Sequence, residues 1–180
     1  AQMAFAEKNY DETLALLEDV LTRAPTNIDE RLLQAQALLF KGETKKAVDS
    51  YQTALKFEPQ AVMAMVNTSI AYAKMGENDK SEKYLQKALK QAPDNAAANF
   101  NMGLLKAEKN DLKAAEKYLK KALKADPQMA QAAFNLCVII AKDRINEAVT
   151  WCRKASDLRP QDPKYAYTLA FYLYQKGEKT

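Results

Sequence analysis

The sequence predicts an all-α protein made of tandem helix pairs, and three periodic features support this prediction. Prolines recur at intervals of 34, 34, 34 and 33 residues, namely Pro25, Pro59, Pro93, Pro127 and Pro160. An alanine stands five positions before four of these prolines: Ala54, Ala88, Ala122 and Ala155. Each interval holds two segments of about 14 residues in which apolar residues recur at helical spacing, with a short polar break between them. A fixed period of this length is typical of stacked repeats.

Each repeat is predicted to be an antiparallel helix pair with defined stop signals. The first helix ends at a residue that tolerates a left-handed backbone, as Gly42, Gly76 and Asn110 do at the same point of successive repeats. The second helix ends at the proline, which lacks an N–H group and disfavours helical geometry in the residue before it. The turn at 142–144 has lost one residue and has no glycine, so we expect the weakest local geometry there.

The predicted helices follow this pattern from one end of the chain to the other. In order, they cover 1–8, 11–24, 28–41, 44–57, 62–75, 78–91, 96–109, 112–125, 129–142, 145–158 and 163–176. Boundaries read from a pattern of this kind carry an error of about two residues.

Small residues that keep the same period resemble the tetratricopeptide repeat family over essentially the whole chain. With the proline counted as place 32 of 34, the small residues at place 8 are Ala35, Ser69, Gly103, Cys137 and Ala170. Those at place 20 are Ala47, Ser81, Ala115 and Ala148, and the alanines before the prolines hold place 27. The resemblance implies an αα-superhelix, a solenoid of 34-residue helix-turn-helix units whose first helices line a concave surface. The chain departs from the family at place 4, where an aromatic is common but residues such as Arg31 and Asn99 stand.

In this register the chain is a single solenoid over 1–180, divided into repeats at fixed boundaries. These are a partial first repeat 1–27, repeat two 28–61, repeat three 62–95, repeat four 96–129, repeat five 130–162 with a one-residue deletion, and the first helix of a sixth repeat 163–180. Both ends fall inside a repeat and look cut. The compartment stays open, because a missing N-terminal region could have carried a targeting signal.

Composition argues against an enzyme and against a cofactor or metal site. The chain has no histidine, the usual neutral-pH general base and the commonest metal ligand. It has four glycines and neither of the glycine-rich phosphate-binding motifs. No apolar run approaches the 18 residues of a membrane span. The net charge is +4, and residues 130–180 hold eight Lys and Arg against five Asp and Glu, which permits an acidic partner there.

The candidate binding face consists of places 2, 6, 9 and 13 of each first helix, which point away from the second helix on a helical wheel. Asn67, Asn101 and Asn135 share place 6, and an asparagine amide can pair with both the C=O and the N–H of an extended peptide. The neighbouring candidates are the apolar Ile70, Leu104, Val138 and Phe171, the aromatic Phe100, Phe134 and Tyr167 at place 5, and Lys74, Lys142 and Lys164. The alternative is that these residues only pack one repeat on the next.

The function that follows is a non-enzymatic scaffold that binds an extended peptide segment of another protein. Two alternatives stay open: a non-catalytic arm of a larger enzyme or multidomain polypeptide, and a module that self-associates end to end through 163–176, where Leu169, Ala170 and Leu173 would be uncovered. The terminal-carboxylate clamp of chaperone-binding relatives is disfavoured, because nearly all its cations are missing. Nucleic-acid binding is also disfavoured, because the lysines of the second helices have only Tyr84 and Tyr118 as interleaved aromatics.

The two cysteines are predicted to be neighbours. Cys137 holds place 8 of a first helix and Cys152 holds place 24 of the following second helix, so both face the seam between these helices. A disulfide needs Cα atoms within about 7 Å, which is closer than most helix pairs approach. We therefore expect a reduced, buried pair, and a disulfide between the two cysteines stays open as the alternative.

Overall fold

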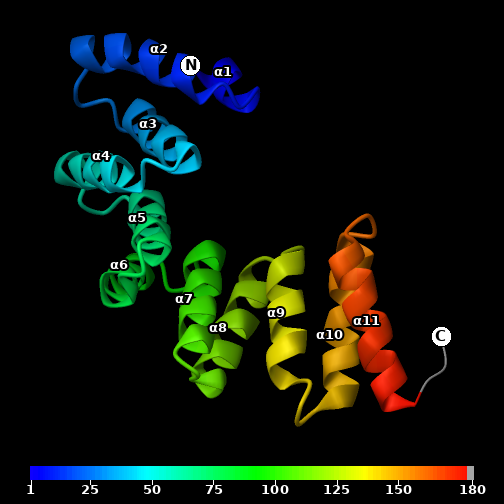
Figure 1. Cartoon of the computed structure of the whole chain (residues 1–180). Coiled ribbons are helices and arrows are strands. Elements are labelled where there is room, and N and C mark those ends of the chain that lie inside the picture. The colour runs from blue at the N-terminus through cyan, green and yellow to red at the C-terminus, as the bar shows by residue number, and fades with distance from the viewer. Residues whose placement is uncertain (178–180) are drawn as a thin grey trace. The chain divides into compact units, whose positions relative to one another are not determined.

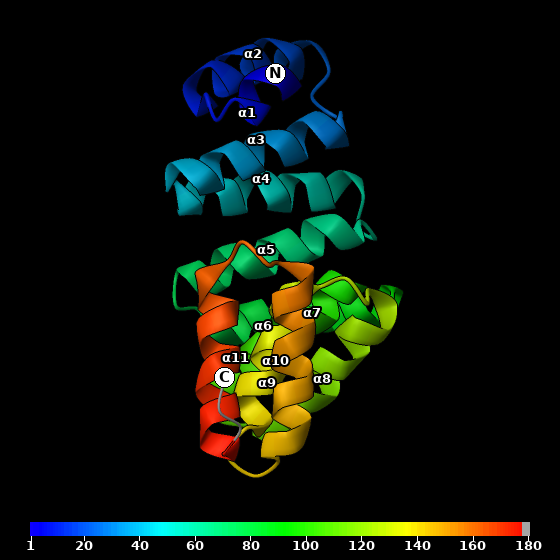
Figure 2. The same ribbon diagram turned by 90° about the vertical axis from the view of Figure 1, so that its right-hand side faces the viewer.

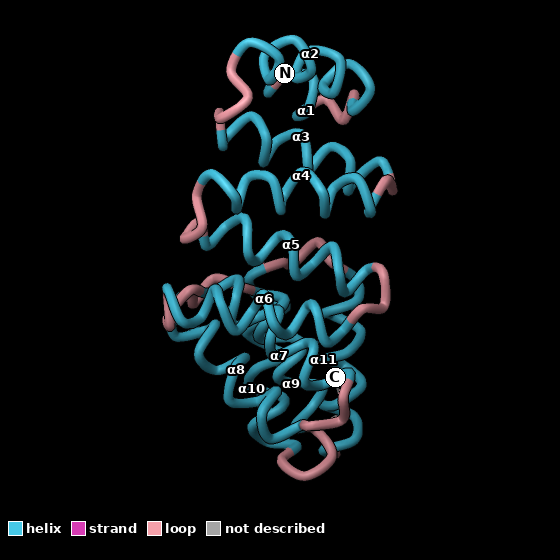
Figure 3. Tube along the Cα trace, turned by 90° about the vertical axis from the view of Figure 1, so that its left-hand side faces the viewer, coloured by secondary structure: helices cyan, strands magenta, loops and turns pink. Residues whose placement is uncertain are grey.

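The computed structural model describes residues 1–177, and these residues form α-helices joined by short turns (Figures 1 and 3). The helices are α1 Gln2–Ala6, α2 Tyr10–Arg23, α3 Ile28–Lys41, α4 Thr44–Phe57, α5 Val62–Lys74, α6 Asn78–Gln91, α7 Ala96–Glu108, α8 Leu112–Ala125, α9 Ala130–Ile140, α10 Ile145–Leu158 and α11 Pro163–Lys176. No strand occurs in this range. The prediction of an all-α chain of helix pairs is confirmed, and every helix boundary lies within two residues of its predicted place. Residues 178–180 of the predicted sixth repeat lie outside the described range.

The turns inside the repeats follow the predicted stop signals. Gly42, Gly76 and Asn110 have φ of 89°, 75° and 59°, which is the left-handed region. Lys8, at the same place of the partial first repeat, also has a positive φ of 61° although it is not a glycine. The turn between α9 and α10 has no left-handed residue, and α9 is 11 residues long where α7 has 13. The deletion in repeat five therefore shortens its first helix.

Several helices begin at a side-chain cap. The side chains of Asn27 and Asn95 accept hydrogen bonds from the backbone N–H groups of Glu30 and Ala98, and Asp111 accepts one from Ala114. These bonds satisfy N–H groups that have no partner inside the helix. None of the helices in the described range is long and apolar enough to cross a bilayer.

The chain divides into two compact units, of which unit 1 covers Ala1–Ala92 and unit 2 begins at Pro93. In unit 1, helices α3, α4 and α5 lie side by side (Figure 2). Their buried core consists of Ala35, Leu38, Ala47, Val48, Tyr51, Ala71 and Tyr72. Alanines at the predicted small places 8 and 20 are fully buried, so the backbones of the paired helices can approach closely there.

The core of unit 2 joins α8, α9, α10 and α11, and includes Leu119, Leu136, Cys137, Ile140, Cys152 and Tyr165. Leu173 of α11 is only 9% exposed, and Leu169 packs against the same core. The expectation that both leucines form an uncovered stripe is therefore wrong, because packing within unit 2 buries Leu173 and partly buries Leu169. Ala170, the third member of that predicted stripe, is exposed.

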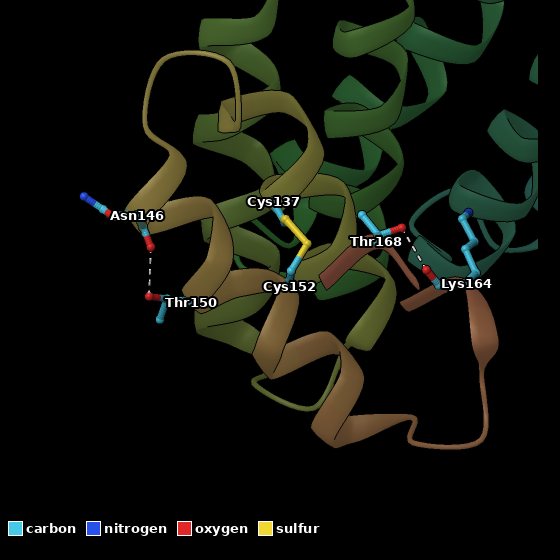
Figure 4. The surroundings of a disulfide bond; sticks show 6 residues. All are labelled: Cys137, Asn146, Thr150, Cys152, Lys164 and Thr168. Carbon is cyan, nitrogen blue, oxygen red and sulfur yellow. Dashed lines mark hydrogen bonds between the residues drawn. A yellow bond between two sulfur atoms is a disulfide. The ribbon is translucent and has the colours of Figure 1, made fainter. Parts of the chain in front are cut away.

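Cys137 and Cys152 form a disulfide that joins α9 to α10, with a Cα–Cα distance of 5.3 Å (Figure 4). The predicted adjacency is confirmed, and the expectation of a reduced pair is wrong. The small residues Ala148 and Ala155, at places 20 and 27, are fully buried in this hairpin, so the two helices can approach closely there. The seam of repeat five is therefore narrow enough for a disulfide, which needs Cα atoms about 4.4–6.8 Å apart.

Candidate functional site

Three consecutive first helices of unit 2 carry a polar side chain in the same orientation. Asn101 of α7 and Asn135 of α9 donate from Nδ2 to the backbone carbonyls of Ala97 and Gln131, each at 2.8 Å. Thr168 holds the same place on α11, and its hydroxyl donates to the carbonyl of Lys164, also at 2.8 Å (Figure 4). We call Asn101, Asn135 and Thr168 the polar row.

The hydrogen bonds along each helix fix the side chains of the polar row while leaving some of their bonding capacity. An asparagine amide has two N–H groups and an oxygen with two lone pairs, and the bond to the carbonyl four residues earlier uses one N–H. The amide oxygens of Asn101 and Asn135 are not used by that bond and can accept from a backbone N–H of another chain. Thr168 lies on the predicted binding face at place 6, but the asparagine pattern did not single it out because its polar group is a hydroxyl.

Asn67, at the same place on α5 of unit 1, has a different environment. Its Nδ2 is buried and has no hydrogen-bond partner among residues 1–177. The three asparagines that sequence places in one ladder are therefore not equivalent. Ile70 is half-buried and Lys74 is exposed on the same helix.

Unit 2 contains a hollow of about 550 Å³ between the end of α9, the start of α10 and the last turns of α11. Its lining residues are Val138, Ala141, Lys142, Ile145, Phe171, Tyr172 and Gln175, and we call this space the α9–α11 hollow. Val138 and Phe171 are 43% and 45% exposed, which is high for large apolar side chains. Three predicted site residues, Val138, Lys142 and Phe171, therefore meet at one concave surface.

The aromatic residues predicted at place 5 divide between core and surface. Phe134 is 9% exposed and packs on Tyr165 with ring centroids 5.0 Å apart, so it belongs to the core. The Lys164 ammonium lies 4.3 Å from the centroid of the Phe134 ring, a cation–π contact that links α11 to α9. Phe100 packs against the same core, whereas Tyr167 is exposed. Leu104, at place 9 of α7, is half-buried.

The other lining residues of the α9–α11 hollow follow from the shortened turn. Because α9 ends at Ile140, Ala141 and Lys142 form part of a turn instead of continuing the helix. Sequence reasoning located this irregular turn but did not name Ala141, Ile145 or Tyr172 as site residues. The signal that could have found them is the deletion itself, since a shortened helix leaves space beside its neighbour.

A second hollow, of about 540 Å³, lies in unit 1 among α2, α3 and α4. Its lining is largely polar and includes Arg31, Gln34, Lys41, Asp49 and Ser50. None of the predicted site residues lines it. Arg31 donates from its guanidinium to the carbonyl of Pro25 at 2.7 Å, so this arginine ties α3 to the preceding loop.

A similar loop contact explains the departure from the family at place 4 of repeat four. Asn99 is fully buried, and its Nδ2 donates at 2.9 Å to the carbonyls of both Pro93 and Asn95. A polar side chain at place 4 can thus hold the proline loop where other family members use an aromatic. Asn99 and Arg31 each bond to the loop before their helix, and neither holds a place of the candidate binding face.

A cluster of four charged side chains connects α8 to the start of α10. The guanidinium of Arg144 pairs with the carboxylates of Glu116 and Glu147, and the Lys120 ammonium lies 2.7 Å from Glu116 and 3.2 Å from Glu147. The hydrogen bond from Arg144, followed by that from Lys120, lowers the pKa of Glu116 to about 2. Arg144 belongs to the shortened turn, so this cluster holds the turn against the neighbouring repeat.

No group of three or more His, Cys, Asp or Glu side chains within residues 1–177 is placed to hold a metal ion. The α9–α11 hollow, the concave feature that includes predicted site residues, combines apolar side chains with one cation, Lys142, and such a mixture is typical of a ligand-binding surface.

Profiles of the tetratricopeptide repeat family match residues 4–70 and 106–172, and a second profile of that family matches residues 68–130. A curated relative, the DnaJ homolog subfamily C member 7 homolog of Schizosaccharomyces pombe, is 30% identical over 64 residues, which are 36% of this chain and 13% of that protein. The chain therefore spans only a small part of that relative.

Two solved structures illustrate the similarity of fold. PilW, described as a widely conserved type IV pilus biogenesis factor, superposes with a TM-score of 0.82 at 24% identity over 98% of this chain and 83% of its own. YrrB, described as a tetratricopeptide repeat protein with an unusual peptide-binding site, superposes with a TM-score of 0.69 at 17% identity over 91% and 84% of the two chains. These identities support the fold alone.

Proposed function

We propose that this chain, which belongs to the tetratricopeptide repeat family, binds an extended peptide segment of another protein along the polar row and the α9–α11 hollow of unit 2. Members of the family generally act as protein–protein interaction modules and are typically non-catalytic. The peptide-binding site that the description of YrrB mentions belongs to that protein, and it makes the same kind of ligand reasonable here.

The observation that carries the proposal is the shared orientation of Asn101, Asn135 and Thr168. Each side chain is held by a carbonyl four residues earlier, so a partner does not have to immobilise it on binding. Backbone hydrogen bonds to such a row would bind an extended segment with little regard for its sequence, and pockets beside the row would supply specificity. Asn67, Ile70 and Lys74 stay candidate residues for peptide binding by unit 1 itself.

The test compares the chain with the variant Asn101→Ala/Asn135→Ala. A phage-displayed library of random linear peptides is selected on the unaltered protein, and the affinities of the recovered peptides are measured by fluorescence anisotropy. We expect the double variant to bind them about fivefold to 150-fold more weakly, because it loses two hydrogen bonds of about 0.5–1.5 kcal/mol each. Thermal stability should stay nearly unchanged, because both side chains bond only to their own helix.

Asn146→Ala provides the matched control, because Asn146 is an exposed asparagine on the second helix α10. This variant should bind the same peptides as well as the unaltered protein. A library that yields no binder, or binders that the double variant retains, would contradict the proposal. A large fall in melting temperature of the double variant would instead favour a structural role for the row.

A second candidate function is end-to-end self-association through α11. Tyr167, Ala170, Phe171 and Tyr174 are exposed on this helix, which favours a partner on that face. Sedimentation velocity over a range of concentrations tests it: a concentration-dependent dimer that Tyr174→Ser abolishes would support self-association, and a monomer throughout would exclude it. A role as the non-catalytic arm of a larger polypeptide is compatible with either function.

A further inference from the structure

We propose that the α9–α11 hollow selects a partner segment in which a large apolar side chain stands next to carboxylates, and that Lys142 determines this preference. The inference rests on the proposed function, because it names the chemistry of the segment that the same face binds. It concerns side-chain specificity at one end of the face, whereas the polar row concerns backbone binding.

The apolar half of the inference follows from the walls of the hollow. Val138 of α9 and Phe171 of α11 expose more than two fifths of their surface, and Ile145 and Tyr172 complete the wall. The volume of about 550 Å³ lies in the range of about 300–1,000 Å³ that protein ligand sites occupy. A large aliphatic or aromatic side chain inserted here would remove apolar surface of both partners from water, which is the area-dependent part of affinity.

The charged half follows from the position of Lys142. Of the seven lining residues, Lys142 is the only charged one, and none is acidic. Lys142 is exposed and forms no ion pair with any residue of the described range 1–177. A carboxylate beside the inserted side chain would meet this ammonium without having to displace an existing partner.

Arg144, the other cation of the shortened turn, is already engaged with two glutamates. Arg144 pairs with Glu116 and Glu147, and the pKa of Arg144 is raised, chiefly by its hydrogen bond to Glu116 and to a smaller extent by Asp143. The nearest acidic residue in sequence, Asp143, is thus within electrostatic reach of Arg144. Because residues 130–180 also carry a net charge of +3, the field on this part of the chain favours an acidic segment.

The test uses three acetylated, fluorescein-labelled nonapeptide amides with the same central tryptophan–leucine pair. The flanking residues are aspartates in the first peptide, serines in the second and lysines in the third. Affinities for the whole chain are measured by fluorescence anisotropy at low and at physiological salt. We expect the aspartate peptide to bind about fivefold more tightly than the serine peptide, the effect of one favourable exposed ion pair, and the lysine peptide to bind most weakly. The difference should shrink as salt is raised.

Two variants and one control separate the contribution of the Lys142 charge from that of the apolar contact with Phe171. Lys142→Glu should reverse the order of the aspartate and lysine peptides, and Phe171→Ala should weaken all three. Lys113→Glu changes the same charge on the exposed surface of α8, away from the hollow, and should leave the order unchanged. Circular dichroism confirms that each variant is folded, and Lys142→Gln, which should only abolish the preference, replaces Lys142→Glu if the latter unfolds.

Each result bears on the inference separately from the proposed function. If the three peptides bind equally and Phe171→Ala weakens them, the preference for carboxylates is wrong while peptide binding stands. If none of the three binds, or if a single-stranded oligonucleotide binds in a Lys142-dependent manner instead, the inference is overturned. The proposed function then depends only on the library selection and the polar row.

Discussion

The hairpins α7–α8 and α9–α10 are neighbours in unit 2 with the same fold, but they hold their two helices together in different ways. In α7–α8, place 8 is Gly103 and place 24 is Leu119, and a Cβ added at Gly103 would stand 2.9 Å from Leu119 Cγ. In α9–α10, the same two places hold Cys137 and Cys152, joined by the disulfide. The same two places of the repeat are therefore in contact in both hairpins, through packing in α7–α8 and through a covalent bond in α9–α10.

The turns of the two hairpins also differ, since one is closed by local backbone geometry and the other is held by added side-chain links. Asn110 closes α7 with a left-handed backbone, whereas the turn after α9 is one residue shorter, has no left-handed residue and is held by Arg144 on Glu116. The hairpin with the regular turn relies on contact at its seam, and the hairpin with the irregular turn has a disulfide and an ion cluster. The irregular turn is also where the α9–α11 hollow lies, so the added links coincide with the candidate site.

The largest expected effect comes from breaking the disulfide. A crosslink that closes a loop of 15 residues is worth about 3 kcal/mol in the chain-entropy account. We expect Cys137→Ala/Cys152→Ala, or reduction of the unaltered protein, to lower the free energy of unfolding by about that amount in urea titrations. The double variant should not respond to reductant, which makes it the control. A reduced protein as stable as the oxidised one would show that the seam of α9–α10 is held by packing alone.

The next effect concerns the contact that takes the place of the disulfide in α7–α8. Gly103→Ala places a methyl group against Leu119, and overpacking of this kind costs about 1–3 kcal/mol, partly offset by the better helix propensity of alanine, about 1 kcal/mol. We therefore expect a net destabilisation of about 1 kcal/mol in urea titrations. The control is the same change in a Leu119→Ala background, where space is available and Gly103→Ala should stabilise the protein. Additive effects of the two changes would contradict a direct contact.

A smaller effect is expected from Glu116→Gln, which weakens the cluster that holds the shortened turn. The cluster is largely exposed, so we expect a loss of up to about 1 kcal/mol near neutral pH. The folded-state pKa of Glu116, about 2, lies below its ordinary value of 4.5, so its contribution is present above pH 4.5 and is lost as the pH falls towards 2. Urea titrations at a series of pH values should show the difference between the two proteins shrink over that range. Glu108→Gln, an exposed carboxylate of α7, should show no such trend.

The smallest effect concerns Asn110. Of the two hairpins compared, only α7–α8 has a residue with a left-handed backbone in its turn. Asn110→Gly should stabilise the protein by about 0.5 kcal/mol, because glycine adopts a positive φ without the cost that a Cβ adds. Asp143→Gly, in the turn without a left-handed residue, should instead lower the melting temperature. A gain from both changes would mean that the two turns are equivalent after all.

The periodic residues predict most of the fold, because proline, glycine and alanine act through local backbone geometry and close approach. They locate the helix ends within two residues and place Cys137 beside Cys152. They do not predict the disulfide, since the helix separation depends on the sum of many side-chain contacts. The burial of Leu173 has the same origin: α11 packs on α9 and α10 through tertiary contacts that a single helical wheel does not include.

The candidate site is only partly predictable from the wheel. Val138, Lys142 and Phe171 meet at one hollow as their shared face suggests, but Phe134 turns into the core and Asn67 buries its amide nitrogen. A helical wheel predicts the direction in which each side chain points from its own helix. It does not predict how far a neighbouring helix buries that side chain. Ala141 and Ile145 line the hollow because a helix stops early, which depends on a deletion rather than on residue type.

The central claim is that a covalent bond in α9–α10 replaces the contact that holds α7–α8 at the same two places. Native-state hydrogen exchange, measured on the oxidised and the reduced protein, tests it helix by helix. On reduction, the amides of 145–158 should lose about a hundredfold in protection, which corresponds to about 3 kcal/mol, while those of 112–125 keep theirs. Equal losses in both helices, or no loss in either, would contradict the claim.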